Sequence, residues 1–152
     1  MNKFQKGDML VVLQSSDKNN VGKVGAVIDI TDGDYYTLDV MPNYAFKEDC
    51  LKKAHGADLI REERRRQIEV EGYDAKHDFN EPLNNIVAAA VSYAMVDIDK
   101  QEAEAWWNWD FKYWKPKDRK RNLVRAGALI AAALDKMQDE EDFKNWQKEN
   151  KV

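Results

Sequence analysis

The character of the sequence changes near residue 56, and this change limits the possible folds more than any other feature. Before it, short runs of β-branched and aromatic residues alternate with glycine-containing turns, a pattern typical of strands. The expected strands cover residues 9–13, 24–30 and 35–40. The Asp32-Gly33 pair between the last two is a strong hairpin signal. Beyond the change, glycine and proline become rare and helical periods begin, so the fold class is expected to be α+β, with domains at residues 1–54 and 55–152.

Three helices are expected in the second domain. They run from about Ala57 to Glu71, from Pro82 to about Asp97, and from near Lys117 or Asp118 to about Gln138. In the last helix, apolar residues at a 4-3-4-3 spacing predict one apolar seam, made of Leu123, Gly127, Ile130, Leu134 and Met137. Alanines crowd the second helix at 88–90 and the third at 126–133. Small side chains let two backbones approach, so these helices are expected to pack as a close pair.

Length and composition indicate a globular, cytoplasmic protein. The chain has 152 residues, of which 43% are hydrophobic and 34% charged, enough for a real core beneath a well-hydrated surface. It contains no apolar run of the roughly 18 residues that a membrane helix needs, and its start, MNKFQKGDML, does not resemble a signal peptide. A single cysteine, Cys50, cannot form an internal disulfide, which fits a reducing compartment.

The net charge of −4 hides an uneven distribution. Residues 57–104 carry 6 basic and 12 acidic side chains, whereas residues 105–136 carry 8 basic and 3 acidic ones. A protein that binds long duplex DNA usually has a broader basic excess. Nucleic acid is therefore a possible partner but not the favoured one, and the pattern suits a compact anionic ligand or contact between acidic and basic helical faces.

The tract from Trp106 to Arg125 combines four of the five tryptophans with seven lysines and arginines. Aromatic rings beside guanidinium groups are typical of surfaces that bind a nucleobase and its phosphates. Trp109 and Trp114 are candidate stacking residues, although these tryptophans could instead fill a gap beneath a long loop. Arg119, Arg121 and Arg125 lie in the first turns of the last helix, where the helix dipole disfavours cations, so a bound anion is expected there.

Two further groups complete the candidate site. Arg64 lies on the core-facing stripe of the first helix with Gln67 and Glu71 alongside, and it either pairs internally with Glu71 or reaches a pocket to bind a phosphate or carboxylate. His77 and Asp78 follow in an expected loop. They are candidates for a metal ligand or a general base, with a hydrogen-bonded structural element as the alternative.

Motifs for common catalytic chemistries are missing from the sequence. There is no Walker loop, glycine-rich dinucleotide fingerprint, GxSxG or CxxC pair. We therefore assign no catalytic residue, no metal ligand and no cofactor. The candidate ligand-binding residues are Arg64, Gln67, Glu71, His77, Asp78, Trp109, Trp114, Lys115, Arg119 and Arg125.

Two resemblances add expectations to this interpretation. The segments GDMLVVL, VGKVGAVIDI, YYTLDV and FKEDCLKKA resemble SH3-like small barrels, in which residues 44–46 would close the sheet and residues 47–53 form a helical turn. The segments ERRRQIEVEGYDAKHD, AAAVSYA and WNWDFKYWKPKDRKRNLVRAGALI resemble an uncharacterised family of small phage and prophage proteins. That family carries acidic residues where this chain has Phe79 and Asn85, so an acidic cluster for a divalent metal is incomplete.

The leading hypothesis is a phage-encoded binding protein, not an enzyme. In the host cytoplasm it would sequester a small nucleotide-derived signalling molecule, of the cyclic nucleotide or cyclic ADP-ribose type, and so counter bacterial immunity, as a homo-oligomer. One alternative is an adaptor for nucleic acid or a host protein, built on the β domain. The other is a MazG-like nucleotide pyrophosphohydrolase, which would use the glutamates of the first helix with Asp97 and Asp99.

Overall fold

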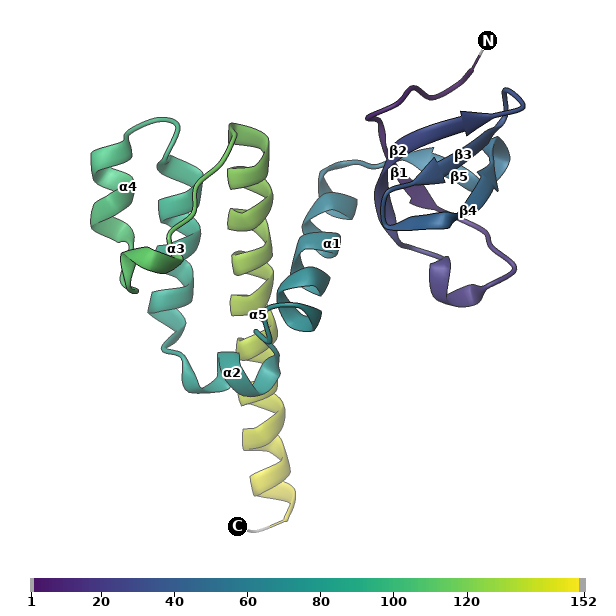
Figure 1. Ribbon diagram of the computed structural model, residues 1–152. Coiled ribbons are helices and arrows are strands. Elements are labelled where there is room, and N and C mark those ends of the chain that lie inside the picture. Colours follow the sequence, from purple (N-terminus) through teal and green to yellow (C-terminus); the bar gives the residue numbers. More distant parts are fainter. Residues whose placement is uncertain (1, 151–152) are drawn as a thin grey trace. The chain divides into compact units, whose positions relative to one another are not determined.

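The computed structural model describes residues 2–150, and it has α+β architecture with a five-stranded antiparallel sheet followed by five α-helices (Figure 1). Backbone contacts divide the chain into two units that meet between Glu62 and Glu63. This division falls inside α1 (Gly56–Glu69), whereas the sequence places the domain boundary between residues 54 and 55. We call the two parts the sheet unit and the helical unit.

The sheet unit contains strands in the order β4-β3-β2-β1-β5. They are β1 (Met9–Val12), β2 (Val24–Thr31), β3 (Tyr35–Leu38), β4 (Met41–Lys47) and β5 (Leu51–Lys53). The predicted hairpin is present between β2 and β3, where Asp32 and Gly33 both have positive φ, 52° and 81°. The three predicted strands are confirmed within a few residues.

Two expectations for the sheet unit were wrong. The barrel is not closed, because β4 and β5 are the edges of the sheet and no described strand joins them. The helical turn expected over residues 47–53 is limited to a 3₁₀ turn at Glu48–Cys50, since Lys47 ends β4 and residues 51–53 form β5. The physical reason is pairing: β5 aligns Leu51 with Val12 of β1, and such long-range ladder bonds override the local signal of a short charged segment.

The core of the sheet unit is apolar and continuous. Its buried residues are Phe4, Leu10, Val12, Val27, Tyr36, Leu38, Met41, Phe46 and Leu51. Gly25 lies within β2 at a point where the segment containing Asp39 and Val40 passes close to the β2 backbone. A β-carbon at this position would lie 2.7 Å from Asp39 Oδ1 and 2.7 Å from Val40 Cγ2, too close for any larger residue without movement.

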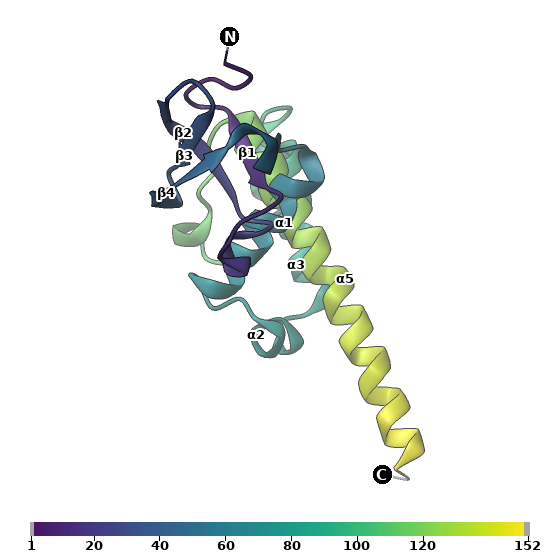
Figure 2. The same ribbon diagram turned by 90° about the vertical axis from the view of Figure 1, so that its right-hand side faces the viewer.

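The helical unit continues from the end of α1 and contains α2 (Ala75–Asn80), α3 (Leu83–Met95), α4 (Lys100–Trp106) and α5 (Arg119–Glu149) (Figures 1 and 2). The expectation of three helices was wrong, because two further short helices, α2 and α4, are present. Each of them begins at an aspartate cap. Asp74 accepts a hydrogen bond from the His77 amide, and Asp99 accepts one from the Glu102 amide. Helix α5 also runs to Glu149, well past the expected end near Gln138.

The close pair of helices predicted from the small residues is confirmed as α3 and α5. These helices pack on each other, and Ala88 to Ala90 of α3 are buried together with Ala126, Ala128, Ala132 and Ala133 of α5. In contrast, the predicted apolar seam of α5 is exposed apart from Gly127, which is half-buried. No helix within residues 2–150 has the length and hydropathy that crossing a membrane requires.

Candidate ligand-binding cavity

The helical unit contains a cavity of about 590 Å³ that is open to solvent on one side, and its volume is within the usual range for small-molecule sites. Eight of the ten candidate residues line it: Arg64, Gln67, Glu71, His77, Asp78, Trp109, Lys115 and Arg125. They come from α1, the turn after it, α2, the segment after α4, and α5. Beside the cavity, the contact between Arg64 and Asp135 joins residues 71 positions apart in the chain.

Arg64 is a buried wall residue, and each of its three nitrogens has a partner within the chain. Its Nη2 lies 2.7 Å from Asp78 Oδ2, its Nη1 donates to the Tyr73 carbonyl at 2.9 Å, and its Nε lies 3.4 Å from Asp135 Oδ2. The pairing with Glu71 considered from the sequence was therefore wrong. Three of the five guanidinium N–H groups have partners, and two of these partners, Asp78 and Asp135, connect α1 to α2 and α5 beside the cavity.

Glu63 is the centre of a second charged cluster on the same wall. Arg66 donates to both Glu63 carboxylate oxygens at 2.9 and 2.8 Å, and Arg121 and Arg125 approach them to 3.6 and 3.9 Å. Burial by itself would raise the pKa of Glu63, but the hydrogen bond and charge of Arg66, with the charges of the other two arginines, hold that pKa below its ordinary value. Two of the three arginines expected to need an external anion at the start of α5 thus face the chain's own Glu63.

Glu71 is exposed and forms an ion pair with a member of the same cluster. Its Oε1 lies 2.9 Å from Arg66 Nη1, so Arg66 bridges Glu63 and Glu71. Gln67 donates from Nε2 to Glu63 Oε1 at 3.4 Å. Both candidate residues therefore contribute polar atoms to the cavity wall while supporting Arg66.

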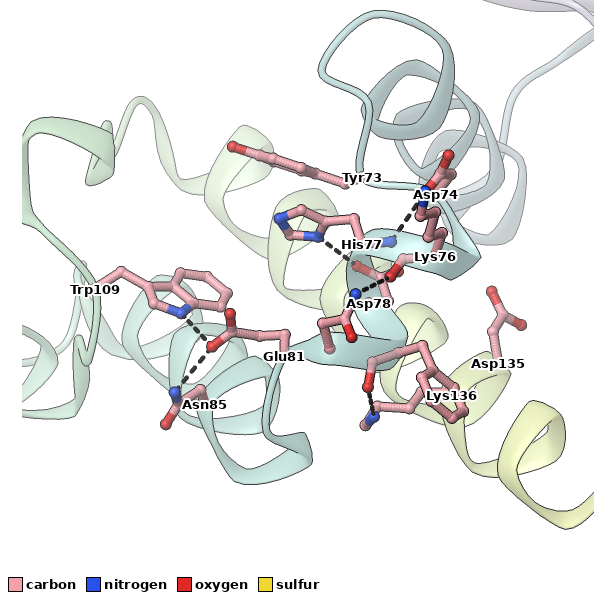
Figure 3. A network of polar contacts seen from close by, with 12 residues as sticks. Tyr73, Asp74, Lys76, His77, Asp78, Glu81, Asn85, Trp109, Asp135 and Lys136 are labelled. Carbon is pink, nitrogen blue, oxygen red and sulfur yellow. Dashed lines mark hydrogen bonds and ion pairs between the residues drawn. The ribbon is translucent and has the colours of Figure 1, made fainter. Parts of the chain in front are cut away.

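His77 and Asp78 lie on α2 rather than in a loop, and this expectation was wrong because Asp74 caps a helix there. The His77 Nδ1 atom lies 3.1 Å from Asp78 Oδ1, while the other oxygen of Asp78 binds Arg64. Figure 3 shows the imidazole beside the Tyr73 ring, with the centroids of the two rings 4.8 Å apart. Asp78 thus orients an imidazole whose other nitrogen makes no hydrogen bond within residues 2–150.

Aromatic rings form a different wall of the cavity. Tyr93, Trp107 and Trp109 pack edge to face, with centroids 5.7 and 5.2 Å apart. Trp109 donates from Nε1 to Glu81 at 2.8 Å, and Asn85 donates to the same carboxylate oxygen (Figure 3). The Trp109 ring is therefore held in one orientation while remaining half-buried.

Lys115 and Arg125 connect the aromatic and charged walls. The Lys115 amide donates to the Tyr93 hydroxyl at 3.2 Å, and Arg125 donates to the Lys115 carbonyl and lies over the Tyr93 ring at 5.5 Å. The Lys115 side chain is exposed and makes no ion pair within the described residues. Lys115 is thus a cavity-lining cation without an ion-pair partner among residues 2–150.

Trp114 and Arg119 do not line the cavity. Trp114 donates from Nε1 to Ser92 Oγ at 2.9 Å and packs against the α3–α5 core, which agrees with the gap-filling alternative. Arg119 is exposed at the first residue of α5, where Asp118 caps the helix through the Arg121 amide. The structure therefore separates these two residues from the other eight.

Several wall residues were not identified from the sequence. Glu81, Tyr73, Tyr93 and Tyr113 line the cavity, and buried Lys136 donates to the Phe79 carbonyl at 2.8 Å beside α2. Burial, followed by the charge of Glu71, raises the pKa of Tyr73. Lys136 lies between Asp135 and Met137 in a mixed stretch of the sequence, so no local pattern marked it as buried.

Between residues 2 and 150, no group of three or more histidine, cysteine, aspartate or glutamate side chains is arranged to hold a metal ion. Comparisons with known protein families, curated proteins and solved structures found no match for this chain. The cavity is therefore the feature of the chain that bears on its function.

Proposed function

We propose that the helical unit is a binding protein for a small nucleotide-derived molecule. The observation that carries this proposal is the meeting of an aromatic wall with ionised groups around a cavity of about 590 Å³. Trp109, with its indole N–H already held by Glu81, offers a ring against which a base can pack. Lys115 offers an uncommitted cation for a phosphate.

The chemical roles within the site differ from those expected for the arginines. Arg64, Arg66 and Arg125 are paired with carboxylates or carbonyls of the chain, so they support the proposal as groups that fix the shape of the cavity. Carboxylates such as Glu81 can accept hydrogen bonds from ribose hydroxyls. A ligand with a base, a ribose and a phosphate would use all of these groups.

The biological setting follows from the resemblance to phage proteins and is part of the proposal. A phage protein in the cytoplasm of its bacterial host would use this cavity to sequester a cyclic nucleotide or cyclic ADP-ribose-type signal and so blunt an immune response. We place no reaction at the site. Glu63 and Glu71, which a pyrophosphohydrolase would direct at magnesium, are instead joined through Arg66.

Tryptophan fluorescence tests the proposal directly, because Trp107 and Trp109 line the cavity. Titration with ADP-ribose and with cyclic dinucleotides should change the emission in a saturable way for at least one of them. Lys115→Ala should weaken that binding roughly ten- to a hundredfold, since a hydrogen bond to a charged group contributes about 1.5–3 kcal/mol. Lys117→Ala is the matched control, because Lys117 is exposed nearby but does not line the cavity.

Two results would contradict the proposal. One is the absence of any saturable change with either ligand class. The other is turnover of nucleoside triphosphates with magnesium that Glu71→Ala abolishes, which would favour the hydrolase alternative. Mass spectrometry of small molecules released by heating protein purified from infected cells would identify the natural ligand.

A further inference from the structure

Helix α5 exposes a long row of apolar side chains. Leu123, Ile130, Leu134 and Met137 are between 44% and 61% exposed, although their 4-3-4-3 spacing is that of a helix seam built for burial. The alanines that pack against α3 lie on another side of α5, and no residue of the row lines the cavity. The row is therefore explained neither by the core nor by the proposed ligand site.

Charged residues extend this row at both ends with opposite sign. Arg119 lies four residues before Leu123, and Glu141 lies four residues after Met137, so both continue the same spacing. Lys120 is next to Arg119, and Asp142 is next to Glu141. Within residues 2–150, neither Arg119 nor Glu141 makes an ion pair. Arg119 is also the arginine at the start of α5 that Glu63 does not approach.

The ends of the row are placed symmetrically about Ile130. Leu123 and Met137 are each seven residues from it, and Arg119 and Glu141 are each eleven residues from it. Two antiparallel copies of α5 that cross at Ile130 would therefore place Leu123 against Met137 and Arg119 against Glu141 at both ends. Parallel copies would instead align Arg119 with Arg119 and Glu141 with Glu141. The charges thus select the antiparallel arrangement.

We propose that α5 is a dimerisation helix through which two copies of this chain pair antiparallel, with Ile130 of both copies at the two-fold axis. The contact from residue 119 to 141 extends over about 33 Å, at about 1.5 Å per residue. A pair centred on Ile130 places Gly127 opposite residue 133 of the second copy and next to its Leu134. Because Gly127 lacks a side chain, it allows close approach beside the axis.

Sedimentation equilibrium of the full chain tests the association. The unchanged protein should be a dimer, and Ile130→Glu should be monomeric at concentrations at least tenfold above those at which the unchanged protein dimerises. Ile98→Glu is the matched control, because Ile98 is 73% exposed but lies outside α5, and it should leave the dimer intact. Circular dichroism should show the same helix content in all three proteins.

Charge exchange provides a second variant that preserves the apolar row. Glu141→Arg should weaken the dimer because it places two arginines together at each end. Combining it with Arg119→Glu should restore association, since the opposite charges meet again. A monomeric unchanged chain, or a dimer that Ile130→Glu leaves intact, would overturn the proposal.

Cysteine cross-linking tests the direction of the two helices. In a Cys50→Ser background, Leu123→Cys and Met137→Cys should form no intermolecular disulfide separately, and should form one when mixed and oxidised. Cross-linking of each variant with itself, but not in the mixture, would show parallel helices and overturn the antiparallel assignment. Failure of every combination, the mixture included, would also overturn the antiparallel assignment.

Discussion

The sheet unit and the helical unit bury different kinds of residue. The interior of the sheet unit is a cluster of large apolar side chains, and its buried polar residues are Asn20 and Asp58. The helical unit buries many alanines and, beside them, the polar residues Glu63, Arg64, Gln67, Asp78, Ser92, Asn122 and Lys136. Two of its large aromatic side chains, Tyr93 and Trp107, belong to this core and also line the cavity.

This difference shows where a binding site can be kept open. A core of large apolar residues packs without large cavities, because every contact removes apolar surface from water. Ion pairs such as Arg64–Asp78 have fixed directions and must be satisfied together, so they hold helices apart around a cavity. The stability of the sheet unit should therefore depend mainly on apolar burial. The stability of the helical unit should depend on ion pairs, which are sensitive to mutation and pH.

The largest expected effect is that of Arg64→Ala on the helical unit. Removing one member of a buried pair leaves Asp78 uncompensated and should lower the free energy of unfolding by about 3–5 kcal/mol. Urea unfolding followed by tryptophan fluorescence measures this, because all five tryptophans lie between residues 106 and 146. Arg64→Met combined with Asp78→Leu should be milder than Arg64→Ala. Equal losses would mean that the pair itself is unimportant.

Leu38→Ala should have a somewhat smaller effect, on the sheet unit. Leu38 is fully buried in the apolar core, so loss of its methyl groups and the remaining cavity should lower the free energy of unfolding by about 3 kcal/mol. Hydrogen exchange of the β2 and β3 amides measures it. The loss should be the same at low and high salt, because no charge is removed. A strong salt dependence would contradict the proposed contrast between the units.

The smallest effect concerns the pH dependence of the helical unit. The pKa of Glu63 is lower in the folded state than in the unfolded chain, so its stabilising contribution is present above the unfolded pKa and is lost as the pH falls through the folded value. Stability measured by tryptophan fluorescence should therefore decrease below about pH 5, since an unperturbed glutamate has a pKa of about 4.3. Glu63→Gln should reduce this decrease. An unchanged slope would show that other carboxylates dominate.

Local patterns were sufficient for much of the secondary structure. The Asp32-Gly33 hairpin and the alanine-rich pair of α3 and α5 follow from turn chemistry and side-chain size, which act between neighbours in the chain or along one helix face. The same patterns failed for β5, which exists because β1 pairs with it. They also failed for α2, where one aspartate cap decides between loop and helix.

The sequence by itself determined which charged and aromatic side chains gather in the helical unit, and eight of ten candidates line one cavity. Only the tertiary structure decided their partners. Arg64 binds Asp78 on α2 and lies near Asp135 on α5 instead of pairing with Glu71, and Arg119 lies outside the cavity. The reason is that an ion pair depends on the distance between elements far apart in the chain, a distance set by how α1, α2 and α5 pack and not by the spacing of residues along any one of them.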